Sequence, residues 1–178
     1  MEFDPKIHHR HSIRLKRYDY CVGAYFVTIV TWRRECLLGE CVGEIMVLND
    51  FGKIVREEWE RTARVRPNVE LGKYMVMPNH FHGILIFVND DNIGATHRVA
   101  PTKNTLRSNS LGAVMAQFKS IVTKRINDMQ NVSGCPIWQR NYYEHIIRGE
   151  REMDRISRYI ESNPSRWKDD EENPNRIS

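Results

Sequence analysis

Residues 24–32 constrain the fold of this chain more than any other stretch of its sequence. They read Ala-Tyr-Phe-Val-Thr-Ile-Val-Thr-Trp, so almost every side chain is β-branched or aromatic. Such side chains favour extended backbone, and a run without polar alternation predicts a strand that is buried on both faces. A sheet built around this strand needs apolar cover on each side.

The rest of the chain predicts three helices and three more strands. The first helix has Asn49 or Asp50 as its N-cap and the second has Ser110, and apolar residues follow each cap at helical spacing. Between these helices, residues 70–77 and 80–88 are expected strands, and the short turn at 78–79 favours antiparallel pairing. Residues 143–147 predict a fourth strand, and a last helix over about 150–162 ends before Pro164.

The order of these elements predicts the fold class. The first six form the pattern of an α+β fold, a ferredoxin-like split βαβ with an antiparallel sheet and two helices on one face. The seventh element, the last helix, is available to cover the second face. We therefore divide the chain into a basic N-terminal arm (1–20), one domain (21–167) and an acidic C-terminal tail (168–178), with a long polar loop at 89–109.

Charge and composition indicate the class of protein only broadly. The net charge is +4 over 178 residues, and the tail holds four acidic against two basic residues, so the first 167 residues carry +6. Such a bias is compatible with a polyanionic partner, and equally with solubility. Apolar stretches are broken within about 10 residues, so no membrane span is expected. The absence of a secretory signal, together with four cysteines that lack CxxC spacing, predicts a cytoplasmic protein with reduced thiols.

The most specific local feature is His80–Phe81–His82 at the start of a predicted strand. Side chains alternate along a strand, so His80 and His82 share one face with Ile84 and Ile86. Two imidazoles about 6–7 Å apart on one face are well placed to bind a metal ion. The alternative is a pair of hydrogen-bonded histidines at a sheet edge with no ligand role.

Tyr159 and Asn163 form a second feature, on the last helix. Their i, i+4 spacing puts them on one helical face. If this helix covers the open face of the sheet, both side chains approach the histidine pair. Asn163 then offers a carbonyl oxygen as a third metal ligand and Tyr159 a phenolic oxygen. The alternative is a core tyrosine followed by an asparagine C-cap.

These features occur within a set of ordered motifs. The set comprises Gly-Ala-Tyr-Phe-Val-Thr at 23–28, Met-Pro-Asn-His-Phe-His-Gly-Ile at 77–84, Phe-Lys-Ser at 118–120, Trp-Gln-Arg at 138–140, Tyr-Tyr-Glu-His-Ile-Ile-Arg at 142–148 and Tyr-Ile-Glu-Ser-Asn-Pro at 159–164. Together they resemble the single-tyrosine HUH transposases of insertion-sequence-200 type, and most of all their REP-associated tyrosine transposase branch. The resemblance covers about residues 14–167.

The resemblance implies an activity on DNA. Members of this family cut single-stranded DNA near hairpins formed by palindromic repeats and rejoin the ends. Carried over, Tyr159 is the nucleophile that forms a 5′-phosphotyrosine, while His80, His82 and Asn163 bind a divalent cation, Mg²⁺ or Mn²⁺. The donor set by itself also suits nickel or zinc. No P-loop is found, in keeping with strand transfer that conserves phosphodiester energy in a covalent link.

Several basic and aromatic residues are candidates for DNA contact. The basic candidates are Lys119, Lys124, Arg125, Arg140, Arg33 and Arg34, together with Arg10, Arg14, Lys16 and Arg17 of the arm. Each is equally compatible with a solvated surface charge. Trp138, Tyr142 and Tyr143 are candidates for stacking on unpaired bases, and Trp138 is as compatible with the core.

Two other functions stay open at this stage. One is a hairpin DNA-binding protein that derives from such a transposase but does not transpose. The other is an RNA-binding or structural ferredoxin-like domain, although residues 80–82 lack the exposed aromatic residues expected there. The resemblance implies a location at the bacterial nucleoid, and it is compatible with a monomer or a homodimer. The hairpin sequence, and whether the protein mobilises itself, are not determined by the sequence.

Overall fold

The computed structural model describes residues 21–88 and 110–176 of the chain. The basic arm (1–20) and the polar loop (89–109), which we had singled out in the sequence, lie outside the described residues. The elements within them are β1 (Gly23–Val30), η1 (Trp32–Arg34), β2 (Gly39–Val42), β3 (Ile45–Leu48), α1 (Asp50–Val65), β4 (Val69–Val76), β5 (His80–Phe87), α2 (Leu111–Met129), β6 (Tyr143–Ile147), α3 (Glu150–Glu161) and η2 (Pro164–Asp169).

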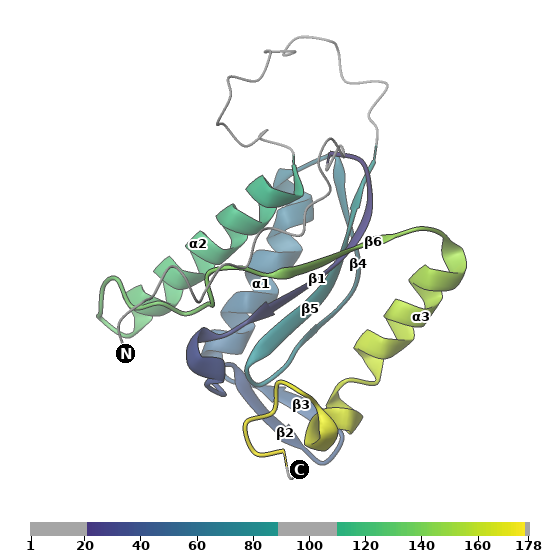
Figure 1. Cartoon of the computed structure of the whole chain (residues 1–178). Helices are drawn as coiled ribbons and strands as arrows, with labels where there is room; N and C mark the ends of the chain where they lie inside the picture. Colours follow the sequence, from purple (N-terminus) through teal and green to yellow (C-terminus); the bar gives the residue numbers. More distant parts are fainter. Residues whose placement is uncertain (1–20, 89–109, 177–178) are drawn as a thin grey trace, which may run out of the picture.

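Four strands form one antiparallel sheet in the order β4-β5-β1-β6. Helices α1 and α2 cover one face of this sheet and α3 lies on the other (Figure 1). The α+β ferredoxin-like fold expected from the sequence is confirmed, with β1 in the centre as its apolar composition requires. The bounds expected for the strands and for the last helix lie within two residues of those observed, and the first two helices begin at the expected N-caps.

The hairpin of β2 and β3 was not expected. These two strands have four residues each and, within the described residues, form a separate two-stranded sheet. Their outward side chains include half-exposed or exposed apolar residues, Val42, Ile45 and Val47. A segment this short shows too little alternation for a period-two pattern to be recognised. The strand predicted over 24–32 also ends early, because the chain turns into η1 and Trp32 is 43% exposed.

Alternation along β5 divides its side chains between two cores. Phe81 and Leu85 join the core beneath α1 and α2, where Trp59 of α1 and Phe118 of α2 pack against Phe81. Ile84 belongs to a smaller core beneath α3, with Ile156 and Ile160 among others. The sheet is thus buried on both faces, and the histidines of β5 share the α3 face with Ile84.

Gly83 permits the close packing of α1 on the sheet. A β-carbon at this position would collide with Cζ2 of Trp59 and would lie 2.8 Å from the Phe81 ring. Trp59 is fully buried, so its indole has no room to move away. The glycine after the His-Phe-His triplet therefore lets the helix layer approach the strand that carries the two histidines.

We expect Gly83→Ala to lower the free energy of unfolding by about 1–3 kcal/mol, the usual cost of inserting atoms into a packed core. Urea denaturation followed by circular dichroism measures this effect. Trp59→Phe removes the colliding atom, so the double variant should cost less than the sum of the two single substitutions. Strict additivity of the two costs would contradict the proposed contact.

No helix in the parts of the chain that the structure describes is long and apolar enough to cross a bilayer.

Candidate metal and tyrosine site

His80 and His82 lie side by side on the α3 face of β5. Their ring centroids are 4.5 Å apart, and both side chains are buried, with 0% and 3% of their surface exposed. The sequence predicted this shared face from strand alternation, and the structure confirms it. The full burial of both rings was not predictable from the triplet, because it depends on α3 and η2.

The Nδ1 atom of His80 lies 2.9 Å from Oδ1 of Asn79. The amide nitrogen of Asn79 in turn donates to the backbone oxygens of Arg34 and Glu172. Its Oδ1 is therefore the acceptor, and the proton of His80 resides on Nδ1. Nε2 of His80 carries a lone pair, and it is buried without a hydrogen-bond partner. An acceptor on the far nitrogen is the arrangement usual for a metal-binding imidazole.

His82 is held in the same way by the neighbouring strand. Its Nδ1 lies 2.8 Å from Oγ1 of Thr28, the residue directly opposite it in the β1–β5 register. Its Nε2 lies 3.5 Å from the hydroxyl oxygen of Tyr159. Both imidazoles thus turn Nδ1 toward a polar side chain of the sheet or its turn, which leaves Nε2 as the atom available to a ligand.

Helix α3 brings Tyr159 to the histidine pair, as the i, i+4 pattern had suggested. The tyrosine ring packs edge-on against Phe26 at 6.1 Å and against His82 at 5.3 Å, and its side chain remains 41% exposed. Asn163 follows the last turn of α3 and is 2% exposed, and its Oδ1 is buried without a hydrogen-bond partner. The C-cap of α3 is Ser162, so capping does not account for Asn163.

Burial sets the protonation state of these groups. It lowers the pKa of His80, although Asp170 and Asn163 partly oppose the shift. Burial and the neighbouring charge of His80 lower the pKa of His82 as well. Burial raises the pKa of Tyr159, and the carboxylate of Asp170 adds to this effect. At neutral pH the site therefore holds two uncharged imidazoles and a protonated phenol.

The donor atoms at this site fit a divalent cation. Among the described residues, His80 Nε2 and Asn163 Oδ1 are buried without a hydrogen-bond partner, which is costly unless something else binds there. Within 21–88 and 110–176, no cluster of three or more His, Cys, Asp or Glu side chains is able to hold a metal. Asn163 interacts with His80 and offers an amide oxygen as a third donor beside the two imidazoles.

The acidic C-terminal segment packs beside the site. Within η2, the ring of Trp167 lies 6.0 Å from that of His80. Arg34 Nε forms a salt bridge of 3.2 Å with Glu172, and the backbone oxygen of Glu172 accepts from Asn79. We had separated residues 168–178 as a tail on composition alone. The structure instead places residues up to 172 against the histidine turn, where their carboxylates act on Tyr159.

The three expected DNA-contact residues of α2 make contacts within the protein. The ammonium group of Lys119 donates to the backbone oxygens of residues 139–141, and burial lowers its pKa to about 8. Lys124 pairs with Asp128 on the same helix. Arg125 bridges to Glu57 and Glu58 of α1. These partners reduce the charge that α2 offers to DNA.

The other three basic candidates lie at the surface. Arg33 and Arg34 both have positive φ angles, 56° and 59°, an uncommon conformation that hydrogen bonds between this turn and Asn79 hold in place. Arg140 is exposed, and its backbone oxygen accepts from Lys119. Of the aromatic candidates, Trp138 is buried in the core and Tyr143 is 50% exposed.

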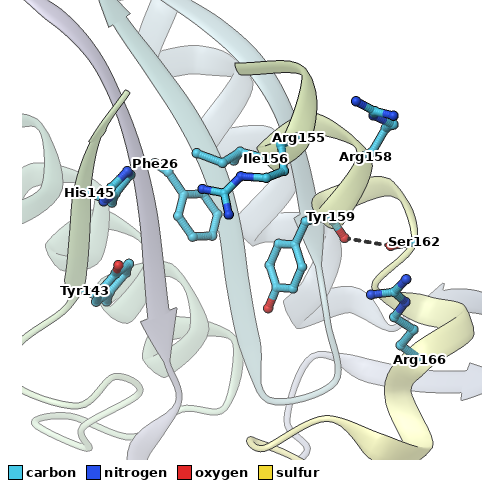
Figure 2. Close-up of a pocket in the computed structure, with 9 residues that line it drawn as sticks. All are labelled: Phe26, Tyr143, His145, Arg155, Ile156, Arg158, Tyr159, Ser162 and Arg166. Carbon is cyan, nitrogen blue, oxygen red and sulfur yellow. Dashed lines mark hydrogen bonds between the residues drawn. The ribbon is translucent and has the colours of Figure 1, made fainter. Parts of the chain in front are cut away.

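Some residues of the site were not identified from the sequence. Asn79 and Thr28 orient the two imidazoles. Thr28 lies opposite His82 in the β1–β5 pairing, so it could have been identified only once that register was known. Beside Tyr159 lies an open pocket, shown in Figure 2, to which Arg155, Arg158 and Arg166 contribute. These arginines come from α3 and η2, and no motif in the sequence distinguishes them from other surface charges.

Comparison with known proteins identifies a close relative and a shared fold. No protein-family model matches the chain. An uncharacterized protein of Haemophilus influenzae (strain Rd) is 37% identical over 175 residues, 96% of each chain, and the two proteins belong to one family. The solved structure of a REP-associated tyrosine transposase bound to a REP hairpin superposes with a TM-score of 0.53 at 21% identity, over 85% of this chain and 72% of that one. This likeness shows a common fold.

The buried histidine pair should make stability depend on pH. Because the folded state lowers both pKa values, the unfolded chain binds more protons below a pH of about 6.5. The contribution of the pair is therefore complete above that pH, and the free energy of unfolding should fall as the pH drops below it. Urea denaturation in metal-free buffer over a series of pH values measures this dependence.

His80→Gln should flatten that dependence by up to about 1.4 kcal/mol per pH unit, the value for one proton. His145→Gln, which removes a histidine outside the pair, is the matched control. Equal slopes for the parent protein and His80→Gln would contradict burial of a neutral His80.

Proposed function

We propose that this chain, a member of the same family as the Haemophilus influenzae protein, is a metal-dependent endonuclease and strand transferase that acts on hairpin or palindromic repeat DNA. It belongs, in this proposal, to the single-tyrosine HUH transposases and to their REP-associated branch. The sequence motifs support this assignment, and so does the shared fold with a transposase that is itself bound to a REP hairpin. The partner we propose is single-stranded or hairpin DNA.

One observation supports the proposal above all others. Strand β5, helix α3 and the start of η2 are far apart in the sequence, yet they bring two imidazoles, a phenol and the Asn163 amide together at one place. Tyr159 is 41% exposed and lines an open pocket through which a phosphate could approach, whereas the histidines and Asn163 are buried. A structural role for the histidines does not explain why Nε2 of His80 lacks a partner in the interior.

Tyr159 has the chemistry that strand cleavage and rejoining require. Its oxygen attacks the phosphorus, the bond from phosphorus to the 3′ oxygen breaks, and a 5′-phosphotyrosine forms. The phenol loses its proton, and the departing 3′ oxygen gains one. One phosphodiester replaces another, so attack by the 3′ hydroxyl reverses the step without ATP. The raised pKa of Tyr159 means that the phenol is protonated at rest.

His80, His82 and Asn163 would hold the cation, with Asn79 and Thr28 orienting the two histidines. A Mg²⁺ or Mn²⁺ held there would supply positive charge that stabilises the phosphate during attack. The neutral imidazoles suit Mn²⁺ better than Mg²⁺ by ligand type. Because both pKa values are lowered, no proton has to be displaced from Nε2 at neutral pH.

The second candidate function is hairpin DNA binding without transposition. The acidic segment at 170–172 favours it, because these carboxylates lie close enough to raise the pKa of Tyr159 and would repel a phosphate there. The presence of all four site residues favours the enzyme. The covalent adduct described next separates the two.

Incubation with Mn²⁺ and a labelled hairpin oligonucleotide, copied from a palindromic repeat beside the coding sequence and carrying single-stranded flanks, should give a covalent protein–DNA adduct on a denaturing gel. Tyr159→Phe should abolish the adduct, because the nucleophilic oxygen is gone, and should leave hairpin affinity unchanged. Tyr74→Phe is the matched control, since its hydroxyl binds Glu60 on the opposite side of the sheet. An adduct with Tyr159→Phe would refute the assigned nucleophile, and hairpin binding without any adduct would favour the second candidate.

Metal binding is testable without DNA. Calorimetric titration with Mn²⁺ should show one saturable site, which His80→Ala or His82→Ala abolishes. Asn79→Ala should weaken it about 10- to 100-fold, the usual effect of losing the group that orients a ligand. His145→Ala controls for the loss of a histidine elsewhere, and unchanged affinity in His80→Ala would rule out this site.

A further inference from the structure

We propose that the pocket between β6 and α3 binds unpaired nucleotides of the DNA strand next to the phosphate that Tyr159 attacks. This inference rests on the proposed function, and it names the part of the substrate that the protein contacts directly. The pocket has a volume of about 660 Å³, within the roughly 300–1,000 Å³ typical of small-molecule sites. Its lining combines aromatic rings with arginines: Phe26, Tyr143, Tyr159, Arg155, Arg158 and Arg166.

The aromatic side of the pocket offers a surface for a base. Phe26 packs edge-on against both Tyr143 and Tyr159, with ring centroids 6.2 Å and 6.1 Å apart. Phe26 is buried, whereas Tyr143 is 50% exposed on β6 and Tyr159 is 41% exposed on α3. A partly exposed aromatic ring on a rigid strand stacks on an unpaired base whatever its sequence, because every base has a π face.

The arginines of the pocket are placed for phosphates. Arg158 and Arg166 form no salt bridge with any acidic side chain in the described part of the chain, and Arg155 lies 3.5 Å from Glu152. Arg125 and Lys124 on α2, in contrast, pair with carboxylates at 2.8 Å and 2.5 Å. Positive charge that the protein does not neutralise internally is thus available at this pocket.

Tyr159 connects the pocket with the histidine pair. Its hydroxyl lies 3.5 Å from His82, while its ring lines the pocket together with Tyr143 of β6 (Figure 2). A strand whose phosphate reaches the hydroxyl therefore has its neighbouring nucleotides beside Tyr143 and the arginines. Bases inside a duplex are stacked on each other and cannot present a free face to Tyr143. The pocket is accordingly a site for single-stranded DNA.

The test uses the full chain with Tyr159→Phe, in EDTA, so that neither adduct formation nor metal contributes. Fluorescence anisotropy measures binding of a labelled single strand of about 12 nucleotides, with the same sequence as a duplex for comparison. Tyr143→Ala should weaken single-strand binding about 5- to 150-fold, the range for one stacked base, and Tyr143→Phe should not. Arg166→Gln should make the log–log salt dependence shallower by about 0.7.

Lys124→Gln removes the same charge from α2, and it should leave both the affinity and the salt slope unchanged. Loss of single-strand affinity in Lys124→Gln equal to that in Arg166→Gln, or full affinity in Tyr143→Ala, would overturn the inference. Absence of single-strand binding in the parent protein would overturn it as well. The adduct assay tests the proposed function separately. If the protein forms the adduct but Tyr143→Ala binds the single strand with full affinity, only the inference about the pocket is refuted. If Tyr143→Ala weakens single-strand binding but no adduct forms, only the proposed cleavage is refuted.

Discussion

The alternation of side chains along β5 is the constraint on which the rest of this structure depends. Odd-numbered residues from Phe81 enter the core beneath α1 and α2, and the even-numbered residues His80 and His82 face α3. A shift of one residue in the pairing with β1 would move both imidazoles into the apolar core. Gly83 and the indole of Trp59 hold the first core tightly closed, which fixes the strand that presents the histidines to the second.

Helix α3 turns this exposed strand face into a site. Ile156 and Ile160 bury its apolar stripe on the sheet, and that docking brings Tyr159 and Asn163 over the histidines. The same burial has two electrostatic consequences, because removal from water disfavours every charged form. It keeps the imidazoles neutral, and so able to bind a cation, and it keeps the phenol protonated.

Charge is distributed unevenly around Tyr159. The carboxylates of residues 170–172 act on its hydroxyl from the side of η2, while Arg155, Arg158 and Arg166 line the pocket on its other side. Much of the remaining basic charge is engaged internally, as Lys119 and Arg125 illustrate. The net charge of the chain is therefore a poor guide to where a polyanion binds. A better guide is the position of Arg158 and Arg166 beside the tyrosine, because these two pair with no carboxylate among the described residues.

The sequence by itself determined the order of the elements apart from the β2–β3 hairpin, the shared face of His80 and His82, and the i, i+4 spacing of Tyr159 and Asn163 at the end of the last helix. These follow from periods of two and 3.6 residues, which are local properties of the backbone. Only the tertiary structure decided that the two pairs meet and that Asn79 and Thr28 orient the imidazoles. It also decided that Arg125 pairs with carboxylates of α1, whereas Arg158 and Arg166 pair with no carboxylate in the described part of the chain. The reason is physical: such contacts join residues tens of positions apart, and their partners are set by strand register and helix docking, which no local period encodes.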